Sequence, residues 1–329
     1  MRILVAGGAG YIGSHAVRHL KKSGHEVWVY DNLGVGHRAA APKETLIVGD
    51  LADRAKLITV LRENKIEAVM HFAAFALVGE SVVDPAKYYL NNVCATIEVL
   101  EAMRAAKVMK LVFSSTTATY GTPEKMPIAE TTPQAPINPY GFSKLVIERA
   151  MDDYAAAYGL AGAALRYFNA AGAAPEGDIG EDHRQESHLI PIVLQVANGQ
   201  RKAITIFGDD YPTADGTCIR DYIHVDDLAS AHELALHKLE PGKVLKLNLG
   251  TGQGYSVRQV INACRKVTGK EIAEEIGARR PGDPPELVAD SSLAKKTLGW
   301  QPKYESVEKI VETAWKWHQS HPNGYQNVS

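Results

Sequence analysis

A tyrosine and a lysine four residues apart, Tyr140 and Lys144, are the residues of this 329-residue chain best suited to acid–base chemistry. Asn138 and Pro139 precede them and supply a helix N-cap and a first-turn proline, so the pair should lie one turn apart on one helix face. A free phenol has a pKa of about 10. A nearby ammonium group favours the phenolate, so the spacing predicts a tyrosine base, with a surface pair as the alternative.

A run of hydroxyl side chains follows an apolar segment at 110–115, and it includes Ser114 and Thr116. The carboxyl ends of parallel strands line the ligand crevice of a doubly wound sheet. We therefore expect one of these hydroxyls to hold the substrate oxygen that Tyr140 deprotonates. A threonine-rich strand end without a ligand is the alternative.

Three glycines, Gly7, Gly10 and Gly13, lie between an apolar run at 2–6 and an amphipathic stretch. Such a loop permits a tight turn, close approach of a pyrophosphate and close helix–strand packing, and it places phosphates at a helix N-terminus. The spacing G-x-x-G-x-x-G is a variant of the usual dinucleotide fingerprint. It predicts a dinucleotide site, and a glycine-rich turn without a ligand is the alternative.

Two acidic residues follow the next two apolar runs. Asp31 lies at the fingerprint distance for accepting both adenosine ribose hydroxyls, where its charge would repel a 2′-phosphate. Arg38 keeps NADP in consideration, but the carboxylate favours NAD. Asp50 is placed to meet the adenine edge. A bound nicotinamide cation would add to the effect of Lys144 on the Tyr140 phenol.

Apolar runs of strand length alternate with amphipathic stretches over the first half of the chain. The runs lack polar alternation, which indicates strands covered on both faces and hence a parallel sheet between helices. The fold class is therefore α/β, a doubly wound Rossmann-type sheet. Strands are expected at 2–6, 26–30, 45–48, 68–73, 110–115 and 163–168, with helices at 12–24, 53–64, 84–106 and 139–158.

The pattern changes after about residue 170, where a long polar, glycine-rich connection begins. Shorter elements follow, which indicates a smaller mixed α/β lobe for the substrate over residues 171–329. The dinucleotide domain is expected over residues 1–170, with 226–250 as candidates to return to its sheet. The later helices are expected at 189–198, 226–237, 256–268 and 305–320, and the later strands at 203–207 and 245–249.

Composition excludes several classes of partner and site. Lys and Arg number 36 against 38 Asp and Glu, so no basic face indicates nucleic acid. Cys94, Cys218 and Cys264 are far apart and odd in number, so neither a disulfide framework nor a metal site is expected. No apolar run approaches a membrane span, and the five-residue run at the N-terminus is too short for a signal peptide. We expect a cytoplasmic protein.

Several longer motifs carry a family resemblance: PYGFSK at 139–144, RYFN at 166–169, FGDDYPTADGTCIRDYIHVDDLA at 207–229 and RRPGD at 279–283. Nearly end to end, the chain resembles the extended short-chain dehydrogenase/reductase family and, within it, the nucleotide-sugar epimerases. The glycine loop and Y-x-x-x-K are shared across the wider family, whereas the 207–229 stretch and RRPGD are more specific to the epimerases.

The resemblance implies a role for each matching residue. Thr116, Tyr140 and Lys144 would be catalytic. The residues around NAD would be Gly7, Gly10, Tyr11, Ile12, Gly13, Asp31, Asn32, Leu33, Asp50, Leu51, Phe72, Ala73, Ala74, Asn91, Ser114, Tyr140, Lys144 and Phe168. The residues holding a UDP-sugar would be Thr116, Tyr140, Asn169, His188, Leu189, Phe207, Arg220, Tyr222, Arg280, Asp283 and Leu287.

Two positions depart from the family pattern. Ala76 stands where many epimerases have a lysine on the NAD pyrophosphate, which puts tight cofactor retention in doubt. His188 stands where some have an asparagine. The family also implies a homodimer in which the helices at 84–106 and 139–158 pair across a two-fold axis.

The activity implied is reversible epimerisation of UDP-glucose and UDP-galactose at sugar C4 through a 4-keto sugar, with transient reduction of bound NAD. Two alternatives remain: another NAD-dependent nucleotide-sugar enzyme, either a 4,6-dehydratase or a decarboxylase, and a regulatory protein that binds NAD without catalysis. The dehydratases carry an Asp-Glu pair directly after the threonine, whereas Thr117 and Ala118 follow it here. Y-x-x-x-K argues against the regulatory protein.

The resemblance also places Leu287 at the wall near the sugar's C2 substituent. In the family a tyrosine there tends to exclude an N-acetyl group, and a smaller residue tends to admit it. We therefore expect slower but measurable turnover of UDP-N-acetylglucosamine. The alternative is that Leu287 is a packed strand residue with no influence on specificity.

Overall fold

The computed structural model describes residues 1–280 and 282–325 and is built around one parallel sheet. Its seven strands follow the order β10-β6-β5-β4-β1-β2-β3, which is the Rossmann order with one strand added. In chain order they are β1 (Arg2–Ala6), β2 (Glu26–Asp31), β3 (Leu46–Val48), β4 (Ala68–His71), β5 (Lys110–Thr116), β6 (Ala161–Tyr167) and β10 (Val244–Leu249).

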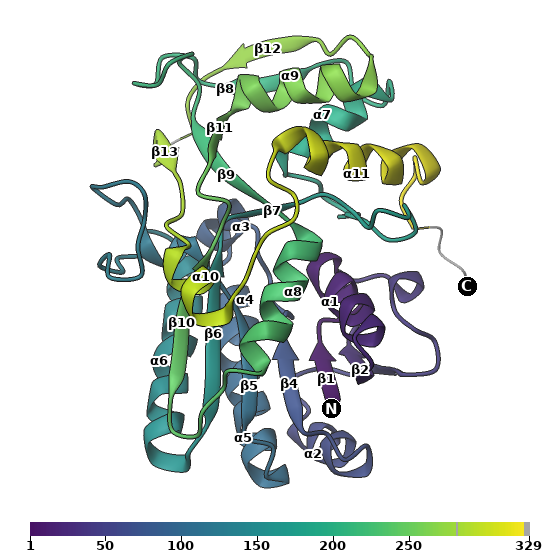
Figure 1. The fold of residues 1–329 in the computed structure, drawn as a ribbon, viewed down its shortest axis with the longest axis vertical. Helices are drawn as coiled ribbons and strands as arrows, with labels where there is room; N and C mark the ends of the chain where they lie inside the picture. Colours follow the sequence, from purple (N-terminus) through teal and green to yellow (C-terminus); the bar gives the residue numbers. More distant parts are fainter. Residues whose placement is uncertain (281, 326–329) are drawn as a thin grey trace.

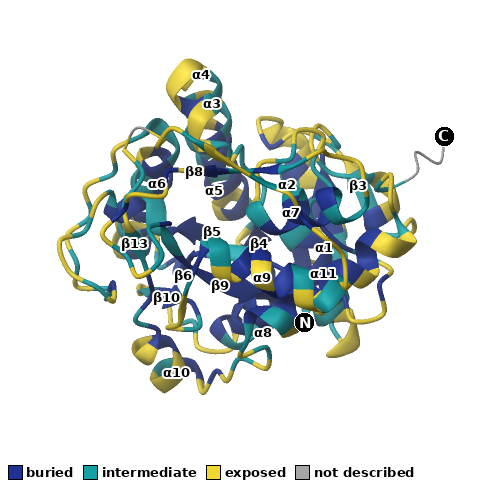
Figure 2. Cartoon of the chain, turned by 90° about the horizontal axis from the view of Figure 1, so that it is seen from above, coloured by how far each residue is buried: buried dark blue, intermediate teal, exposed yellow. Residues whose placement is uncertain are grey.

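Helices cover both faces of this sheet, and each face has its own apolar cluster (Figures 1 and 2). The β-strand interior is dark blue in Figure 2 because side chains on both faces are buried, as the unalternated apolar runs predict. One layer contains α1 (Tyr11–Lys22), α8 (Val225–Leu236) and α10 (Ser292–Leu298). The other contains α2 (Arg54–Glu63), α5 (Ala95–Ala106) and α6 (Pro139–Tyr158).

The topology fixes where a ligand can bind. Strand order reverses between β1 and β4, whose carboxyl ends are followed by the glycine loop and by Phe72. Ligands of open α/β sheets bind at such a switch point, outside the carboxyl ends of the strands. The predicted fold class is confirmed, and residues 226–250 supply α8 and β10 to this domain.

A smaller lobe lies at the upper end of Figure 1 and has its own core. Its sheet centres on β9 (Ile219–His224), which pairs with β7 (Asn169–Ala171), β11 (Gly254–Ser256) and β13 (Glu286–Leu287). A second pair joins β8 (Ile204–Phe207) to β12 (Glu274–Gly277). The helices that pack there are α7 (Leu189–Ala197), α9 (Val257–Thr268) and α11 (Val307–Ser320).

The helix expected over residues 84–106 is wrong as a single element. The structure has α4 (Pro85–Tyr88), then a π-helical segment over Tyr89–Cys94, then α5, and a further short helix α3 (Val78–Val83) precedes them. A π-turn inserts an extra residue into the helix, often at a functional site. The strand expected over 68–73 also ends early, because the amides of Phe72 and Ala73 both donate to the Ala6 carbonyl.

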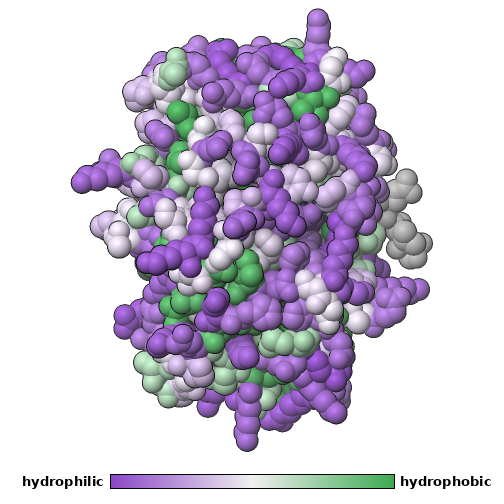
Figure 3. Space-filling view, viewed as in Figure 1, coloured by the Kyte–Doolittle hydropathy of each residue, from purple (hydrophilic) through white to green (hydrophobic). Residues whose placement is uncertain are grey.

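The surface is mainly hydrophilic on the face shown in Figure 3, with small hydrophobic clusters between charged side chains. In residues 1–280 and 282–325 no helix is long and apolar enough to cross a membrane. Cys94, Cys218 and Cys264 are all free thiols, as their spacing predicts.

Candidate active site

The glycine loop between β1 and α1 is packed too tightly for side chains. A Cβ at Gly13 would lie 2.0 Å from the Gly7 carbonyl oxygen, and one at Gly7 would lie 2.5 Å from the Ala73 amide. Gly7 also has a φ of +80°, which glycine adopts without steric cost. At Gly10 a Cβ would meet only the Gly7 oxygen, at 3.4 Å. The loop is therefore a cradle closed on the protein side, which fits a dinucleotide pyrophosphate at the α1 N-terminus.

Asp31 is buried at the end of β2, next to this loop. Its Oδ2 accepts the Ala9 amide at 3.0 Å and its Oδ1 accepts the Leu33 amide at 2.8 Å. Burial raises the pKa of Asp31, and the two amides oppose this shift. Each carboxylate oxygen keeps a further acceptor site, so the geometry fits the predicted contact with ribose hydroxyls.

Other predicted NAD residues also lie after the carboxyl ends of strands. Asp50 follows β3, is exposed, and accepts the Asn32 amide group at 3.1 Å. Phe72 follows β4 and packs on His232 with ring centroids 4.7 Å apart. Asn91 lies in the π-helical segment and donates to Asn92 at 2.9 Å. The sheet thus brings residues from four separated segments to one edge.

The α6 helix begins as the sequence predicts. Asn138 is the N-cap, its side chain accepts the Gly141 amide at 2.8 Å, and Pro139 is the first helical residue. Tyr140 therefore lies in the first turn and is half-buried. The Thr116 side chain, at the end of β5, lies close enough to the Tyr140 phenol to work toward a lower pKa. The structure thus joins the two predicted hydroxyl groups at one strand end.

Lys144 lies one turn beyond Tyr140 and is buried. Its Nζ donates to the Ser114 carbonyl at 2.8 Å and lies 4.7 Å from the centroid of the Phe113 ring. Burial lowers the pKa of Lys144 to about 7, and the charge of Glu148 opposes this shift. The ammonium group is therefore held at the end of β5 between Tyr140 and Glu148.

The expectation that Lys144 lowers the Tyr140 pKa is wrong for the protein alone. Burial raises the pKa of Tyr140, and only the Thr116 hydroxyl works against that rise. The Lys144 ammonium group donates to a backbone carbonyl instead of the phenol. Favouring the phenolate therefore needs a further positive charge, which a bound nicotinamide would supply.

A buried ion pair behind these residues was not predicted. Glu148 Oε2 lies 2.5 Å from Arg166 Nη2, and both side chains are almost fully buried. Glu148 also accepts the Ser115 hydroxyl at 2.5 Å, and Arg166 donates to the Tyr120 hydroxyl at 2.7 Å. Ser115 lies on β5, Glu148 on α6 and Arg166 on β6, so these contacts join the three elements behind Thr116 and Lys144. The four-residue spacing of Tyr140, Lys144 and Glu148 was the one sequence signal that could have placed Glu148 on the same helix face as the two catalytic candidates.

Four predicted substrate residues lie on the small sheet, on β9 and the strands paired with it. Arg220 and Tyr222 are two residues apart on β9, so their side chains point the same way. Leu287 of β13 is the register partner of Arg220, and Asn169 of β7 is that of Tyr222. Tyr222 is buried in the core of the smaller lobe, whereas Leu287 packs against the cluster that contains Phe168.

The remaining substrate residues lie around this sheet. Arg220 Nη2 pairs with Asp283, and the Arg280 guanidinium lies over the Phe207 ring, 4.1 Å from its centroid. Arginines are suited to a diphosphate because they remain charged and donate in a planar fork. His188 occupies the N-cap position of α7 without a capping side-chain hydrogen bond and is exposed, and Leu189 is the first residue of that helix.

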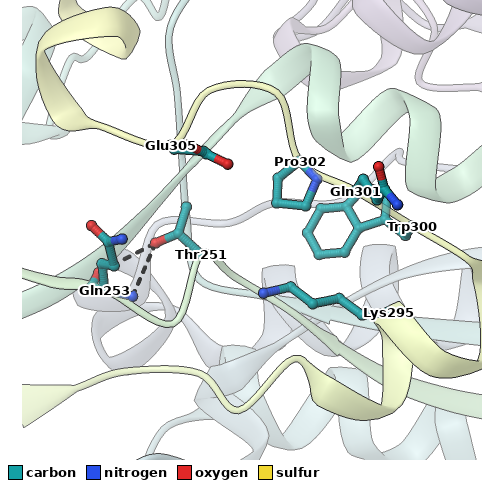
Figure 4. A pocket seen from close by; sticks show the side chains of 7 residues that line it. All are labelled: Thr251, Gln253, Lys295, Trp300, Gln301, Pro302 and Glu305. Atoms are coloured by element: carbon teal, nitrogen blue, oxygen red, sulfur yellow. Dashed lines mark hydrogen bonds between the residues drawn. The ribbon is translucent and has the colours of Figure 1, made fainter.

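A hollow of about 380 Å³ lies apart from these residues, between α10 and the loop after β10 (Figure 4). Its lining includes Thr251, Gln253, Lys295 and Trp300. The Thr251 hydroxyl is tied to the Gln253 backbone and donates to Asp221. None of the predicted catalytic, cofactor or substrate residues lines this hollow, so the strand ends and not this cavity define the candidate site.

The model of the NAD dependent epimerase/dehydratase family matches residues 3–250. The chain belongs to this family. It is 56% identical to UDP-glucose 4-epimerase of Halalkalibacterium halodurans over 99% of this chain and 98% of that protein. It is 53% identical to UDP-glucose 4-epimerase of Lacticaseibacillus casei over 99% of both chains.

Solved structures of the family superpose over almost the full length. A UDP-glucose 4-epimerase structure has a TM-score of 0.96 and 52% identity, covering 99% of this chain and 100% of that one. The Bifidobacterium longum enzyme in complex with NAD+ and UDP has a TM-score of 0.93 and 40% identity, covering 99% and 100%. The UDP-Glc/GlcNAc 4-epimerase of Campylobacter jejuni has a TM-score of 0.84 and 42% identity, covering 97% and 99%.

Proposed function

We propose that this epimerase/dehydratase family chain interconverts UDP-glucose and UDP-galactose at sugar C4, using bound NAD. One observation carries the proposal: Thr116, Tyr140 and Lys144 meet where β5 ends, at the sheet edge that also holds the dinucleotide cradle. A base at the edge of a dinucleotide site is suited to removing a hydroxyl proton while hydride leaves the same carbon.

The chain's own residues move and hold the proton. The Tyr140 oxygen accepts the proton of the sugar 4-hydroxyl and returns it when the 4-keto sugar is reduced. The Thr116 hydroxyl, which lies beside that phenol, donates to the reacting sugar oxygen. Lys144 holds a positive charge one turn away and is kept in place by the Ser114 carbonyl.

Bound NAD would accept the C4 hydride and return it, so the reaction has no net redox change. The glycine loop would hold the NAD pyrophosphate and Asp31 the adenosine ribose. Phe72 would pack against the cofactor at the end of β4. Arg220 and Arg280 would hold the UDP diphosphate. Because the anchoring groups act on the nucleotide, the sugar is left free to turn its other face.

Substitution Tyr140→Phe tests this assignment, with Tyr158→Phe as a matched control. Tyr158 lies at the other end of α6 and is 53% exposed. The phenylalanine keeps the ring but removes the proton acceptor, and loss of a general base costs about 10²–10⁴-fold in rate. We expect Tyr140→Phe to lose UDP-galactose turnover and keep its NAD, while Tyr158→Phe keeps both. Unchanged turnover in Tyr140→Phe would remove this residue from the mechanism.

A wider substrate range is a second candidate. Leu287 lies beside Arg220 on the small sheet and packs near Phe168, a residue predicted to contact NAD. A leucine there is shorter than a tyrosine, so it leaves room on the wall for a C2 acetamido group. The related Campylobacter jejuni enzyme is named for both UDP-Glc and GlcNAc. We infer that UDP-N-acetylglucosamine is also epimerised, more slowly.

A homodimer through the helical regions over 84–106 and 139–158, with α3 beside them, is the third part of the proposal. Exposed apolar side chains gather on α3, the π-helical segment and the start of α6: Val82, Val83, Leu90 and Phe142. The α3–α4 region projects from the body of the molecule in Figure 2. Contiguous exposed apolar surface marks an interaction site. Light scattering should give twice the chain mass, and Val83→Glu with Leu90→Glu should give the monomer mass.

A further inference from the structure

Four potential metal ligands converge in one short segment, between the core domain and α7. They are Glu181, His183, Glu186 and His188. His183 Nδ1 lies 3.3 Å from Glu181 Oε1 and 3.4 Å from Glu186 Oε2. His188 Nδ1 lies 3.3 Å from Glu186 Oε1 and 2.6 Å from Glu181 Oε1. The mechanism proposed above does not use Glu181, Glu186 or His183.

One buried oxygen of Glu181 is a second observation that bears on this cluster. Its side chain is only 4% exposed, yet Oε1 has no hydrogen-bond partner among residues 1–280 and 282–325. The Nδ1 atoms of His183 and His188 both approach that oxygen, but neither has the alignment of a hydrogen bond. That oxygen is held by charge attraction alone, so it can still accept a cation. One ligand atom from each of the four residues lies within 4.8 Å of all the others, which is the proximity that a common cation needs.

The spacings match a tetrahedral ion. Bonds of about 2.0–2.2 Å from a Zn²⁺ ion to imidazole nitrogen and carboxylate oxygen place neighbouring ligand atoms roughly 3.3–3.6 Å apart. Three of the four nitrogen–oxygen separations are 3.3 or 3.4 Å, and the fourth, His188 Nδ1 to Glu181 Oε1 at 2.6 Å, would have to lengthen on binding. We propose that Glu181, His183, Glu186 and His188 bind one first-row divalent cation of the Zn²⁺ type.

The ligand set selects the class of cation. Two imidazoles favour zinc and its neighbours, whereas Mg²⁺ and Ca²⁺ take six or more oxygen ligands. Binding would release any proton held by the two imidazoles. Without a cation the same carboxylates raise the pKa of His183 to about 9 and that of His188 to about 10, so a proton-bridged cluster is the competing state.

The site would fix a segment that touches several parts of the molecule. The Glu181 carbonyl accepts the Trp317 indole at 3.1 Å from α11, and the Asp182 carbonyl accepts His37 Nε2 at 2.9 Å. The His183 ring lies edge-on to Tyr11, the first residue of α1 after the glycine loop, with centroids 6.2 Å apart. A bound cation would therefore rigidify the segment around residues 181–188, which contacts both α11 and the region of the dinucleotide cradle.

The test uses the purified full chain, stripped with EDTA and then equilibrated with ZnCl₂ before desalting. Metal per chain is measured by mass spectrometry, and CoCl₂ titration follows the visible bands of tetrahedral Co²⁺. The variants are Glu181→Gln, His183→Asn and the half-exposed His188→Asn, which keeps the test possible should a buried change prevent folding. His237→Asn is the control, because it belongs to a three-residue group whose single carboxylate, Glu233, already has other partners.

We expect one Zn²⁺ per chain in the parent protein and in His237→Asn. Each ligand variant should bind Zn²⁺ more weakly, by more than the roughly 10–100-fold that is lost when a group hydrogen-bonded to a metal ligand is removed. Zinc should also raise the unfolding midpoint of the parent protein and not that of the ligand variants. Retention of no zinc by the parent, equal retention by the ligand variants, or equal loss in His237→Asn would overturn the site. None of these readouts depends on epimerase activity.

Discussion

Substitution Glu148→Gln should destabilise the protein, because it neutralises one half of a buried ion pair. The Glu148 carboxylate accepts Arg166 Nε at 2.9 Å and the Ser115 hydroxyl at 2.5 Å, and its side chain is 1% exposed. Glutamine keeps the volume. It removes the charge and points an amide donor toward donors that the carboxylate satisfied.

The magnitude follows from that burial. Breaking a buried pair by removing one partner costs about 3–5 kcal/mol, because the remaining charge stays uncompensated. An unfolding entropy of about 2.1 cal/mol/K per residue gives about 0.7 kcal/mol/K for this chain. The midpoint of thermal unfolding should therefore fall by about 4–7 °C.

Calorimetry on holoenzyme preparations measures the change. Asp153→Asn is the control, because its partner Arg149 lies on the same helix and the two side chains are 60% and 74% exposed. No resolvable midpoint change is expected for that surface pair. Adding Arg166→Met to Glu148→Gln should recover part of the loss, since no lone buried charge remains. A midpoint for Glu148→Gln equal to that of the parent would refute the reasoning.

The same variant has a pH readout. Burial lowers the pKa of Lys144 to about 7, and Glu148 works against that shift. Without the Glu148 charge the Lys144 pKa falls further. On raising the pH, Lys144 therefore loses its proton earlier than in the parent protein. The alkaline limb of kcat/KM should therefore move toward lower pH. An unmoved limb would show that Glu148 does not act on Lys144.

Two further predictions concern the cofactor and the sugar. Gly13→Ala should lose most of the co-purifying NAD, because its Cβ would lie 2.0 Å from the Gly7 carbonyl oxygen. The control is Gly79→Ala, whose Cβ would meet nothing within 4 Å. Full NAD occupancy in Gly13→Ala would contradict the assignment of the glycine loop as the pyrophosphate cradle. Leu287→Tyr should suppress turnover of UDP-N-acetylglucosamine selectively, as steady-state rates on both sugars would show. Absence of that activity in the parent, or equal losses on both sugars, would count against the Leu287 wall.

The main sheet was predictable because its strands are unalternated apolar runs between helices with clear stops. The dinucleotide cradle, Asp31 and Tyr140 follow from local spacing in the same way. Their placement at one sheet edge then follows from the topology, since the carboxyl ends of parallel strands share that edge.

The β9 strand was missed because it carries buried charge. Asp221 is fully buried, and its charge is offset by the Thr251, Gly252 and Ala289 amides. Those partners lie 30 to 68 residues away, so no local pattern shows them. The π-helical segment over Tyr89–Cys94 likewise has no sequence signal of its own, and it depends on packing against α6.

The pairing of Glu148 with Arg166 shows the same limit. The helical spacing from Lys144 to Glu148 is visible in the sequence, but Arg166 reads as one charge in an apolar strand. Only the fold places the two side chains together. The Tyr140 pKa was mispredicted for a related reason, because burial is a property of the packed structure.

The most direct test of the proposed function is incubation of the purified protein with UDP-galactose and no added dinucleotide. The account predicts that UDP-glucose accumulates to equilibrium, starting from either sugar, with no net change in the redox state of the protein's NAD. Absence of UDP-glucose from a preparation that contains bound NAD, or product that forms only in proportion to NAD added and consumed, would contradict it.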